Sequence, residues 1–249
     1  LDVGSTANQT ATGSAYEWAL MSYFARVNYN FDEKYLLEFN SRIDGSSRFA
    51  EGYKYGFFPS VSGGWRISEE TFMAGVPGWL YDLKLRASWG MLGNQSIGNY
   101  PFTSGINTGL NYVFGNDNPA LGAALINASN PQISWETTEM TNVGIDAGIG
   151  NFILTADYYI KNTNDILLRL PVPQVAGLAA PYQNAGSVRN NGWDLRVQYG
   201  NEIGDFNFNI GANLSDVKNE IVDLVGTGPY IYERTVQMEG QPIDALFGL

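Results

Sequence analysis

The 249-residue sequence contains no cysteine and no histidine. Without cysteine the chain has no disulfide and no thiol nucleophile, and without histidine it has no imidazole base and no zinc site of the Cys/His type. Positive charge is also scarce, because 14 Lys and Arg face 25 Asp and Glu, which gives a formal net charge of −11. This balance excludes a general nucleic-acid binder, since no basic surplus neutralises phosphates. We expect no metal ion, no cofactor and no nucleic-acid partner.

Long hydrophobic runs are absent as well. No stretch of about 18 apolar residues occurs, which excludes a transmembrane helix. Charged residues make up only 16% of the sequence and aromatic residues 14%, a combination that argues against disorder. A transmembrane β-barrel stays compatible with these numbers, because its apolar face is hidden in an alternating pattern.

Apolar and polar side chains alternate with a period of two in eight segments, which predicts eight β-strands. The apolar faces of these segments carry no charge, whereas the opposite faces together carry both signs. A soluble β-sandwich would show the same alternation, with the apolar face as its core. The segments are 19–31, 35–44, 57–67, 83–89, 142–149, 152–161, 193–199 and 206–215.

The connections between these segments alternate in length. Short connections follow the first, fifth and seventh strands, at 32–34, 150–151 and 200–205. Long connections follow the fourth, sixth and eighth strands, near 92–132, 162–187 and 216–249. The link at 68–80 is longer than a tight turn, and Ser68 is expected to cap a short helix there. Short periplasmic turns and long extracellular loops are typical of outer-membrane barrels, so we expect the long connections to be extracellular.

Aromatic residues of the apolar faces gather at the ends of the strands that border the short turns. Such rings suit a membrane-interface girdle, whereas a soluble core would show no bias towards one end. The residues expected in this girdle are Tyr29, Phe31, Tyr35, Trp65, Tyr81, Phe152, Tyr199 and Phe206.

Charged residues on the opposite faces are then expected to line the lumen of a barrel. A charged wall needs partners or water, because an unpaired buried charge is costly. A domain inside the lumen would supply partners, and pairing between strands of the wall is an equally open explanation. The residues with this expected orientation are Arg26, Glu38, Arg42, Arg66, Arg86 and Asp194.

Several segments, taken in order, resemble the TonB-dependent outer-membrane receptors of the SusC/RagA type found in Bacteroidetes. Each segment alone is a weak signal, but together they cover most of residues 16–249. The segments are Ser22–Tyr29, Tyr35–Leu37, Asp44–Phe49, Phe58–Ser60, Gly64–Ser68, Leu83–Gly90, Gly93–Phe102, Asn130–Pro131, Trp135–Glu139, Asp157–Tyr159, Lys161–Thr163, Asn184, Gly186–Ser187, Arg189–Asn190 and Gly192.

The resemblance implies that residues 1–249 form part of one antiparallel transmembrane β-barrel, the C-terminal portion of a barrel of roughly 22 strands. It implies that a plug domain and a TonB-box region lie outside this chain. It also implies import of glycan or peptide oligomers across the outer membrane. The implied partners are a SusD-like surface lipoprotein, the TonB energising complex, outer-membrane lipid and an oligomeric ligand.

Weak candidates for contact with a ligand or partner lie in and near the longest connection. Aromatic side chains there could stack on sugar rings, although an interface girdle or loop packing explains them better. The candidates are Asn94, Gln95, Tyr100, Tyr112 and Trp135. We expect no catalysis, because carboxylates such as Glu136 and Glu139 are three residues apart and point to opposite faces of a strand.

Two rival interpretations stay open at this point. One is a secreted soluble β-sandwich that acts as a carbohydrate-binding module or hydrolase. The other is a complete eight-stranded barrel with a structural role, whose first and last strands would pair directly.

Overall fold

The computed structural model describes residues 13–76, 78–115, 119–170, 172–173, 175 and 177–248. Its centre is one eight-stranded antiparallel sheet, in which every strand pairs with the next one along the chain in the order β1-β2-β3-β4-β9-β10-β13-β14. The strands are β1 (Leu20–Phe31), β2 (Tyr35–Ser46), β3 (Tyr55–Arg66), β4 (Leu80–Asn94), β9 (Glu136–Ile149), β10 (Phe152–Asn164), β13 (Ser187–Ile203) and β14 (Phe206–Asp223). The prediction of eight antiparallel strands is confirmed.

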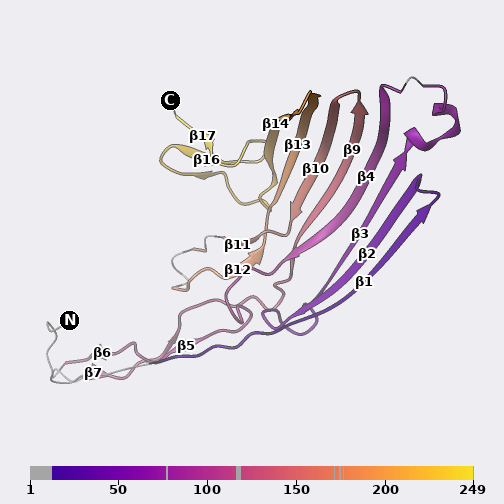
Figure 1. The fold of residues 1–249 in the computed structure, drawn as a ribbon. Coiled ribbons are helices and arrows are strands. Elements are labelled where there is room, and N and C mark those ends of the chain that lie inside the picture. Colours follow the sequence, from indigo (N-terminus) through magenta and orange to yellow (C-terminus); the bar gives the residue numbers. More distant parts are fainter. Residues whose placement is uncertain are drawn as a thin grey trace, which may run out of the picture.

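The sheet curves like a section of a cylinder wall (Figure 1). In the described part of the chain, its edge strands β1 and β14 do not pair with each other, so the sheet is not closed. No second sheet packs on its apolar face there, and Val143, Ile210 and Leu214 are more than half exposed. Neither the β-sandwich nor the complete eight-stranded barrel fits this arrangement. No helix among the described residues is long and apolar enough to span a membrane.

The turns at one end of the sheet are short. They are 32–34 between β1 and β2, 150–151 between β9 and β10, and 204–205 between β13 and β14. The expected turn at 200–205 is wrong in extent, because β13 pairs with β14 as far as Ile203. The backbone ladder continues although Asn201 and Glu202 interrupt the apolar alternation.

The link between β3 and β4 contains two short 3₁₀ helices, η1 (Ile67–Glu69) and η2 (Thr71–Met73). The prediction that Ser68 caps a helix is wrong, because no side chain caps either one and the Ser68 hydroxyl instead lies 3.4 Å from Asp82 Oδ1. Tyr81 also departs from its predicted outward position. A bulge between Leu80 and Asp82 shifts its orientation, and its ring lies over Gly148, on the polar side of the sheet.

The long connections lie at the other end and carry small sheets of their own. These sheets pair β5 (Ile106–Asn107) with β8 (Ala124–Leu125), β6 (Tyr112–Val113) with β7 (Pro119–Ala120), β11 (Leu167–Arg169) with β12 (Tyr182–Asn184), and β16 (Thr235–Gln237) with β15 (Tyr230–Ile231) and β17 (Ala245–Leu246). Figure 1 shows β6 and β7 at the tip of an arm that extends well away from the main sheet.

A small hydrophobic core lies where these connections meet the sheet. One residue of β3 and four residues of the β2–β3 and β4–β9 connections form it, and Phe49 and Ile133 are completely buried. The core residues are Phe49, Phe58, Ile97, Ile133 and Trp135. Many apolar side chains of the main sheet are exposed. The sheet therefore does not bury its apolar face in a core as the sheets of soluble globular proteins do.

Candidate functional site

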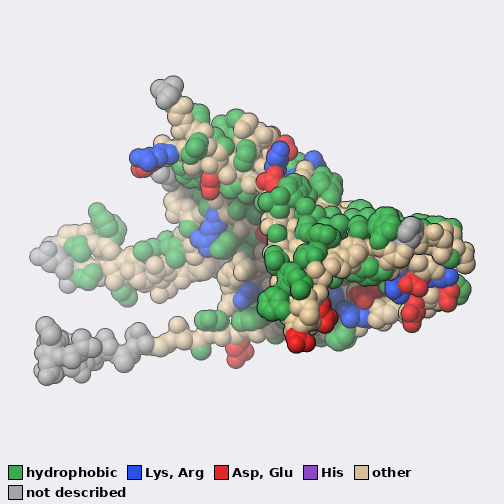
Figure 2. Space-filling view, turned by 45° about the horizontal axis from the view of Figure 1, so that its top comes forward, with side chains coloured by type: hydrophobic (Ala, Val, Ile, Leu, Met, Phe, Trp, Pro, Cys, Tyr) green, Lys and Arg blue, Asp and Glu red, His purple; other side chains and the backbone are tan. Residues whose placement is uncertain are grey.

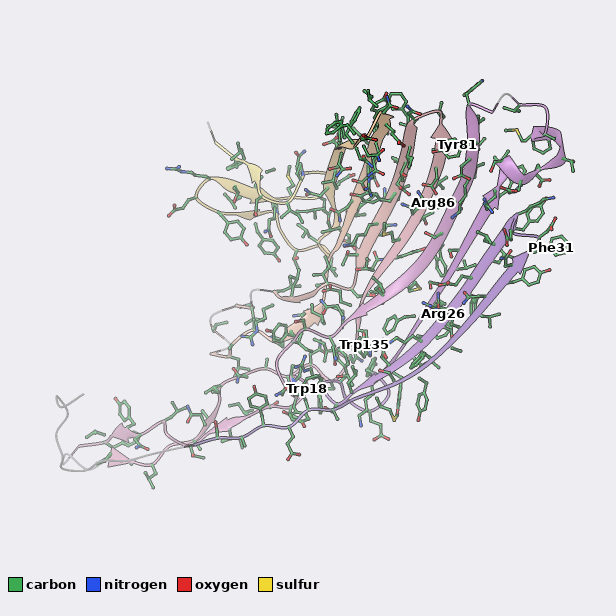
Figure 3. The ribbon with its side chains drawn as sticks, in the orientation of Figure 1. Trp18, Arg26, Phe31, Tyr81, Arg86 and Trp135 are labelled. Carbon is green, nitrogen blue, oxygen red and sulfur yellow. The ribbon has the colours of Figure 1, made fainter. Side chains whose placement is uncertain are left out.

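The register of the sheet brings the six predicted lumen charges to one side, which we call the polar face. Arg66 pairs with Lys84, and Asp157 pairs with Asp194, so these neighbours share a side. Alternation along each strand assigns the others to the same side. The six residues on the polar face are Arg26, Glu38, Arg42, Arg66, Arg86 and Asp194. Figure 3 shows Arg26 on β1 and Arg86 on β4, both away from the ends of their strands. That this face borders a lumen stays a prediction.

Arg86 binds two carboxylates from two other strands. Its Nε and Nη2 atoms donate to Asp146 of β9 at 2.8 and 3.1 Å, and its Nη1 and Nη2 atoms donate to Asp157 of β10 at 3.1 and 3.0 Å. Gly144 is the register partner of both Arg86 and Asp157. A Cβ at Gly144 would overlap with Asp157 Oδ1 and Arg86 Nη2, so the glycine leaves open the path across β9. The two bidentate pairs join three adjacent strands.

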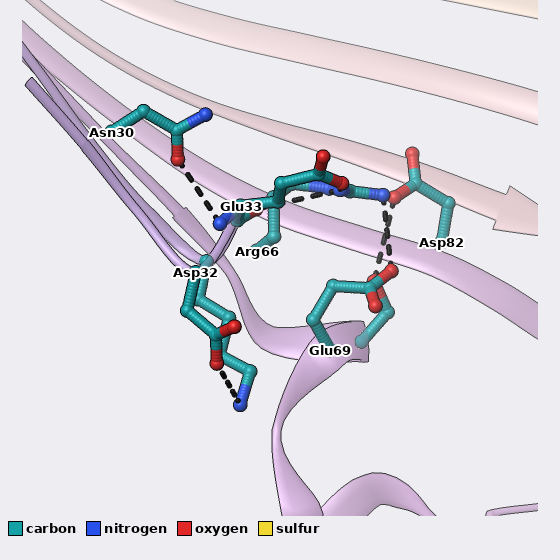
Figure 4. A network of polar contacts seen from close by, with 8 residues as sticks. Asn30, Asp32, Glu33, Arg66, Glu69 and Asp82 are labelled. Atoms are coloured by element: carbon teal, nitrogen blue, oxygen red, sulfur yellow. Dashed lines mark hydrogen bonds and ion pairs between the residues drawn. The ribbon is translucent and has the colours of Figure 1, made fainter.

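The other three arginines of this set also have carboxylate partners. The ion pairs are Arg26 with Glu38 at 3.7 Å, Arg42 with Asp44 at 2.7 Å, and Arg66 with Glu69 at 3.0 Å. Figure 4 shows the Arg66 pair at the short-turn end, with Glu33 close by. Each of the four arginines in this set therefore has a carboxylate partner within the chain itself. Among the residues that the structure describes, Asp194 makes no hydrogen bond and no ion pair through its side chain.

The polar face is the concave one. Two shallow hollows of about 740 and 480 Å³ lie next to each other, and both are bordered by Glu38, Ser62 and Ser88. A third hollow of about 280 Å³ is lined by Asp157 and Asp194, among others. All three lie over polar-face residues, so a bound chain or domain would meet arginines and carboxylates there.

The opposite side, which we call the apolar face, carries a continuous band of exposed hydrophobic side chains. On β1 the band runs from Tyr23 to Phe31, and on β14 from Phe206 to Leu214. Nine residues extend about 27–30 Å along a strand, or about 20–23 Å along the normal at a tilt of about 40°. This is close to the ~25 Å apolar band of outer-membrane barrels. Figure 2 shows a broad hydrophobic area with charged atoms gathered along its border.

Aromatic rings form the border of this band at the short-turn end. Phe152 and Tyr199 are register partners with ring centroids 4.8 Å apart, and Tyr199 lies 6.0 Å from Phe208. On the same face, towards the β1 edge of the sheet, the Phe31 ring lies 6.3 Å from the Tyr35 ring. The predicted clustering of aromatic residues at the short-turn end is present, with Tyr81 as the exception described above.

Trp135 lies at the opposite end, inside the small core. Its ring is 5.3 Å from Phe49 and 5.4 Å from Phe58, and its Nε1 donates to the Lys54 carbonyl at 2.9 Å. Only 7% of the residue is exposed, so neither ring face is open for stacking on a ligand. This environment favours the packing role for Trp135.

Asn94 and Gln95 line one hollow together with Trp135, so the structure brings three of the five contact candidates together. Asn94 Nδ2 donates to Glu136 Oε1 at 3.0 Å, and the Gln95 carbonyl accepts from Arg48 Nη1 at 3.1 Å. These bonds hold the base of the long connection.

Tyr100 and Tyr112 lie apart from that hollow. Tyr100 borders a separate cleft of about 300 Å³ with Arg169 and Tyr182, and its hydroxyl donates to the Glu17 carbonyl at 2.7 Å. Tyr112 lies on the arm, where it is 66% exposed and 4.8 Å from the Phe114 ring. A contact role for these residues stays a prediction.

No functional role was predicted for Glu70, which contacts Trp65 five residues before it and Tyr35 on another strand. Its Oε1 accepts from the Tyr35 hydroxyl at 2.6 Å and from Trp65 Nε1 at 3.0 Å. These hydrogen bonds hold the pKa of Glu70 below the usual 4.5 of a glutamate. No group of three or more Asp and Glu residues in the described ranges could hold a metal ion.

An open antiparallel sheet with a lipid-sized apolar band and a charged concave face defines a segment of an outer-membrane β-barrel wall. Residues 2–245 match the family described as TonB dependent receptor-like, beta-barrel. The chain belongs to this family, whose barrels lie in the outer membrane.

The relatives place it near the SusC and RagA members. The TonB-dependent receptor P26 of Formosa agariphila is 40% identical over 83% of this chain, which covers 21% of that protein. The TonB-dependent receptor SusC of Bacteroides thetaiotaomicron is 35% identical over 86% of the chain, which covers 22% of it. The chain thus spans about a fifth of the length of these relatives.

Solved structures agree with this assignment. The RagAB peptide importer in its closed-closed state matches with a TM-score of 0.80 and 33% identity, over 91% of this chain and 25% of that one. The FrpB iron transporter of Neisseria meningitidis matches at a TM-score of 0.52 over 84% of this chain and 28% of that one, with 16% identity, which shows the shared fold alone. The predicted resemblance to the SusC/RagA type is confirmed.

Proposed function

We propose that this chain forms part of the wall of an outer-membrane transporter that imports nutrient oligomers, either glycans or peptides. The observation that carries the proposal is the two-sidedness of the sheet. One face is a lipid-sized apolar band, and the other is concave, charged and hollowed. The role is transport without catalysis, in keeping with the receptor family to which the chain belongs.

The open sheet supports a wide lumen. A closed barrel of about eight strands fills its interior with side chains, whereas barrels of about 22 strands enclose a lumen that a plug can occupy. Here β1 and β14 do not pair with each other in the described residues, and the relatives are four to five times longer than this chain. A lumen of that width suits an oligomer better than a single small ion.

The proposed partners act at the two ends of the sheet. A SusD-like lipoprotein would cover the end that carries the long connections, which are then extracellular loops near 92–132, 162–187 and 216–249. The TonB complex would act from the short-turn side, through parts of the protein outside this chain. The RagAB importer and SusC are similar over most of the chain, which supports this arrangement.

Uptake by cells tests the proposal. A strain that lacks the full-length gene should lose growth on one defined class of oligomer, peptide or glycan, and complementation should restore it. Uptake should stop when the proton motive force is dissipated, because the import is energised through TonB. Growth that is unchanged on every oligomer tested would contradict the import role. A full-length protein that stays soluble without detergent would contradict the membrane wall.

A contact role for the arm is testable in the same cells. Tyr112→Ala should lower the rate of uptake at limiting oligomer without changing the amount of folded barrel, since the ring is exposed. Phe114→Ala is the matched variant for the neighbouring ring. Wild-type uptake in both variants would remove the arm from the ligand path.

A further inference from the structure

The link between β3 and β4 places two consecutive glutamates on opposite faces of the sheet. Glu69 Oε1 accepts from Arg66 Nη2 at 3.0 Å, on the polar face. Glu70 Oε1 accepts from Tyr35 and Trp65, which are register partners on the apolar face. The side chains of Glu69 and Glu70 therefore bind opposite faces at the rim of the sheet, and the Glu70 contact holds the start of the following segment beside the apolar face.

The segment that follows has no charged residue. Residues 71–79 read Thr-Phe-Met-Ala-Gly-Val-Pro-Gly-Trp. Phe72 is 65% exposed and Trp79 55% exposed. The other turns at this end are two or three residues long, and they carry only glycine, Asn, Asp, Glu and Lys. An exposed, uncharged, aromatic segment at one turn alone is costly in water.

The two ends of this segment are fixed next to the sheet. Glu70 precedes η2 and holds its start beside the Tyr35 and Trp65 rings. The Trp79 carbonyl accepts the Gly150 N–H at 2.6 Å, which ties its end to the turn between β9 and β10. Both ends of the segment are thus held at the rim of the sheet, and its start lies beside the aromatic border of the apolar face.

We propose that residues 71–76 and 78–79 lie in the headgroup region of the bilayer leaflet on the short-turn side, with Phe72 and Trp79 as interfacial anchors. Tryptophan and other aromatic rings favour this region, where one side is apolar and the other wet. Because the segment lacks charge, the partner is the phospholipid surface itself and not a particular headgroup. The inference rests on the proposed membrane-wall function.

Spin-label accessibility tests the position of the segment. Since this chain has no cysteine, a nitroxide can be attached at Phe72→Cys in the full-length protein after replacement of any cysteine outside the chain. The protein is placed in vesicles of phosphatidylethanolamine and phosphatidylglycerol. We expect the ratio of oxygen collision to collision with a water-soluble nickel complex at position 72 to lie between the values for water and for the hydrocarbon core. Asp205→Cys, in the polar turn between β13 and β14, should show the low ratio of a site in water.

Two outcomes would overturn the inference. A label at position 72 that is as accessible to nickel as the one at 205 would place the segment in water. A label that is inaccessible to both reagents would indicate a protein partner instead of lipid. Val143→Cys on the apolar face separates these failures from failure of the proposed function. If position 143 reports lipid and position 72 does not, only the interfacial segment is refuted.

Variants at the Glu70 contact test separately whether Glu70 positions the segment. Glu70→Ala should lower the lipid signal at position 72, because both side-chain hydrogen bonds that hold the start of the segment are lost. Tyr35→Phe and Trp65→Phe each remove one of the two hydrogen bonds and should each cause a smaller loss. Equal lipid signals in all three variants and the parent would contradict the role of Glu70 in positioning the segment.

Discussion

Asp157 and Asp194 lie directly opposite each other on β10 and β13, yet only Asp157 is paired with a cation. Arg86 reaches Asp157 from β4 across the intervening strand β9. Like charges that face each other across a strand pair destabilise a sheet. We therefore expect Asp157 to stabilise the barrel and Asp194 to destabilise it, although the two residues share a register position and a face.

Asp194→Asn should stabilise the barrel by about 0.2–1 kcal/mol, because it removes the repulsion without leaving a cation unpaired. Asp157→Asn should destabilise it, because Arg86 loses one of its carboxylates. Unfolding of the full-length protein in detergent with guanidinium measures both. Clear destabilisation by Asp194→Asn would mean that a cation from outside this chain, as in a plug domain, binds Asp194.

Gly144→Ala should lower the free energy of unfolding by about 1–3 kcal/mol, since the new methyl overlaps with the Arg86–Asp157 pair. Gly63→Ala is the control, because a Cβ there would meet Leu37 Cδ2 at 3.5 Å and the Leu36 carbonyl oxygen at 3.9 Å, both ordinary contacts. Heat-induced loss of the compact gel mobility ranks the two proteins. Equal stability of the two variants would contradict the Arg86–Asp157 pair across β9.

Val143→Arg should cost about 2–4 kcal/mol if Val143 faces lipid near the midplane. Asn142→Arg places the same side chain one residue away, on the polar face, and should be far better tolerated. Unfolding in lipid vesicles gives the comparison. A small effect at both positions would count against lipid contact of the apolar face.

Trp135→Ala should destabilise the loop end by about 3–5 kcal/mol, the usual cost of removing a buried Trp ring. Trp135→Phe should recover much of the packing while leaving the Lys54 carbonyl without its donor. Limited proteolysis would detect the change as faster cleavage in the long connections. The Tyr112→Ala protein, which loses only an exposed ring, should be cleaved at the same rate as the parent protein.

The strands and their faces could be predicted from the sequence because alternation directly encodes which side each residue takes. Their ends could not, since pairing of the backbone continues beyond the apolar band, as in β14 to Asp223. The face of Arg86 was predicted, but its link to Asp157 depends on the gap at Gly144 across another strand. Tyr81 was misjudged because a bulge decides its orientation. The place of Trp135 in the small core depends on loop packing that the sequence does not specify.

The contact of Glu70 should make the position of residues 71–76 depend on pH. The hydrogen bonds from Tyr35 and Trp65 lower the pKa of Glu70 in the folded protein below 4.5. A lowered folded pKa means that the stabilisation is complete above about pH 4.5 and is lost as the pH falls through the folded pKa. We therefore expect a nitroxide at position 72 to become more mobile only on acidification below pH 4.5. Glu70→Gln should remove this transition, whereas Glu51→Gln, exposed at the opposite end, should retain it. A transition that persists unchanged in Glu70→Gln would assign the pH dependence to another carboxylate.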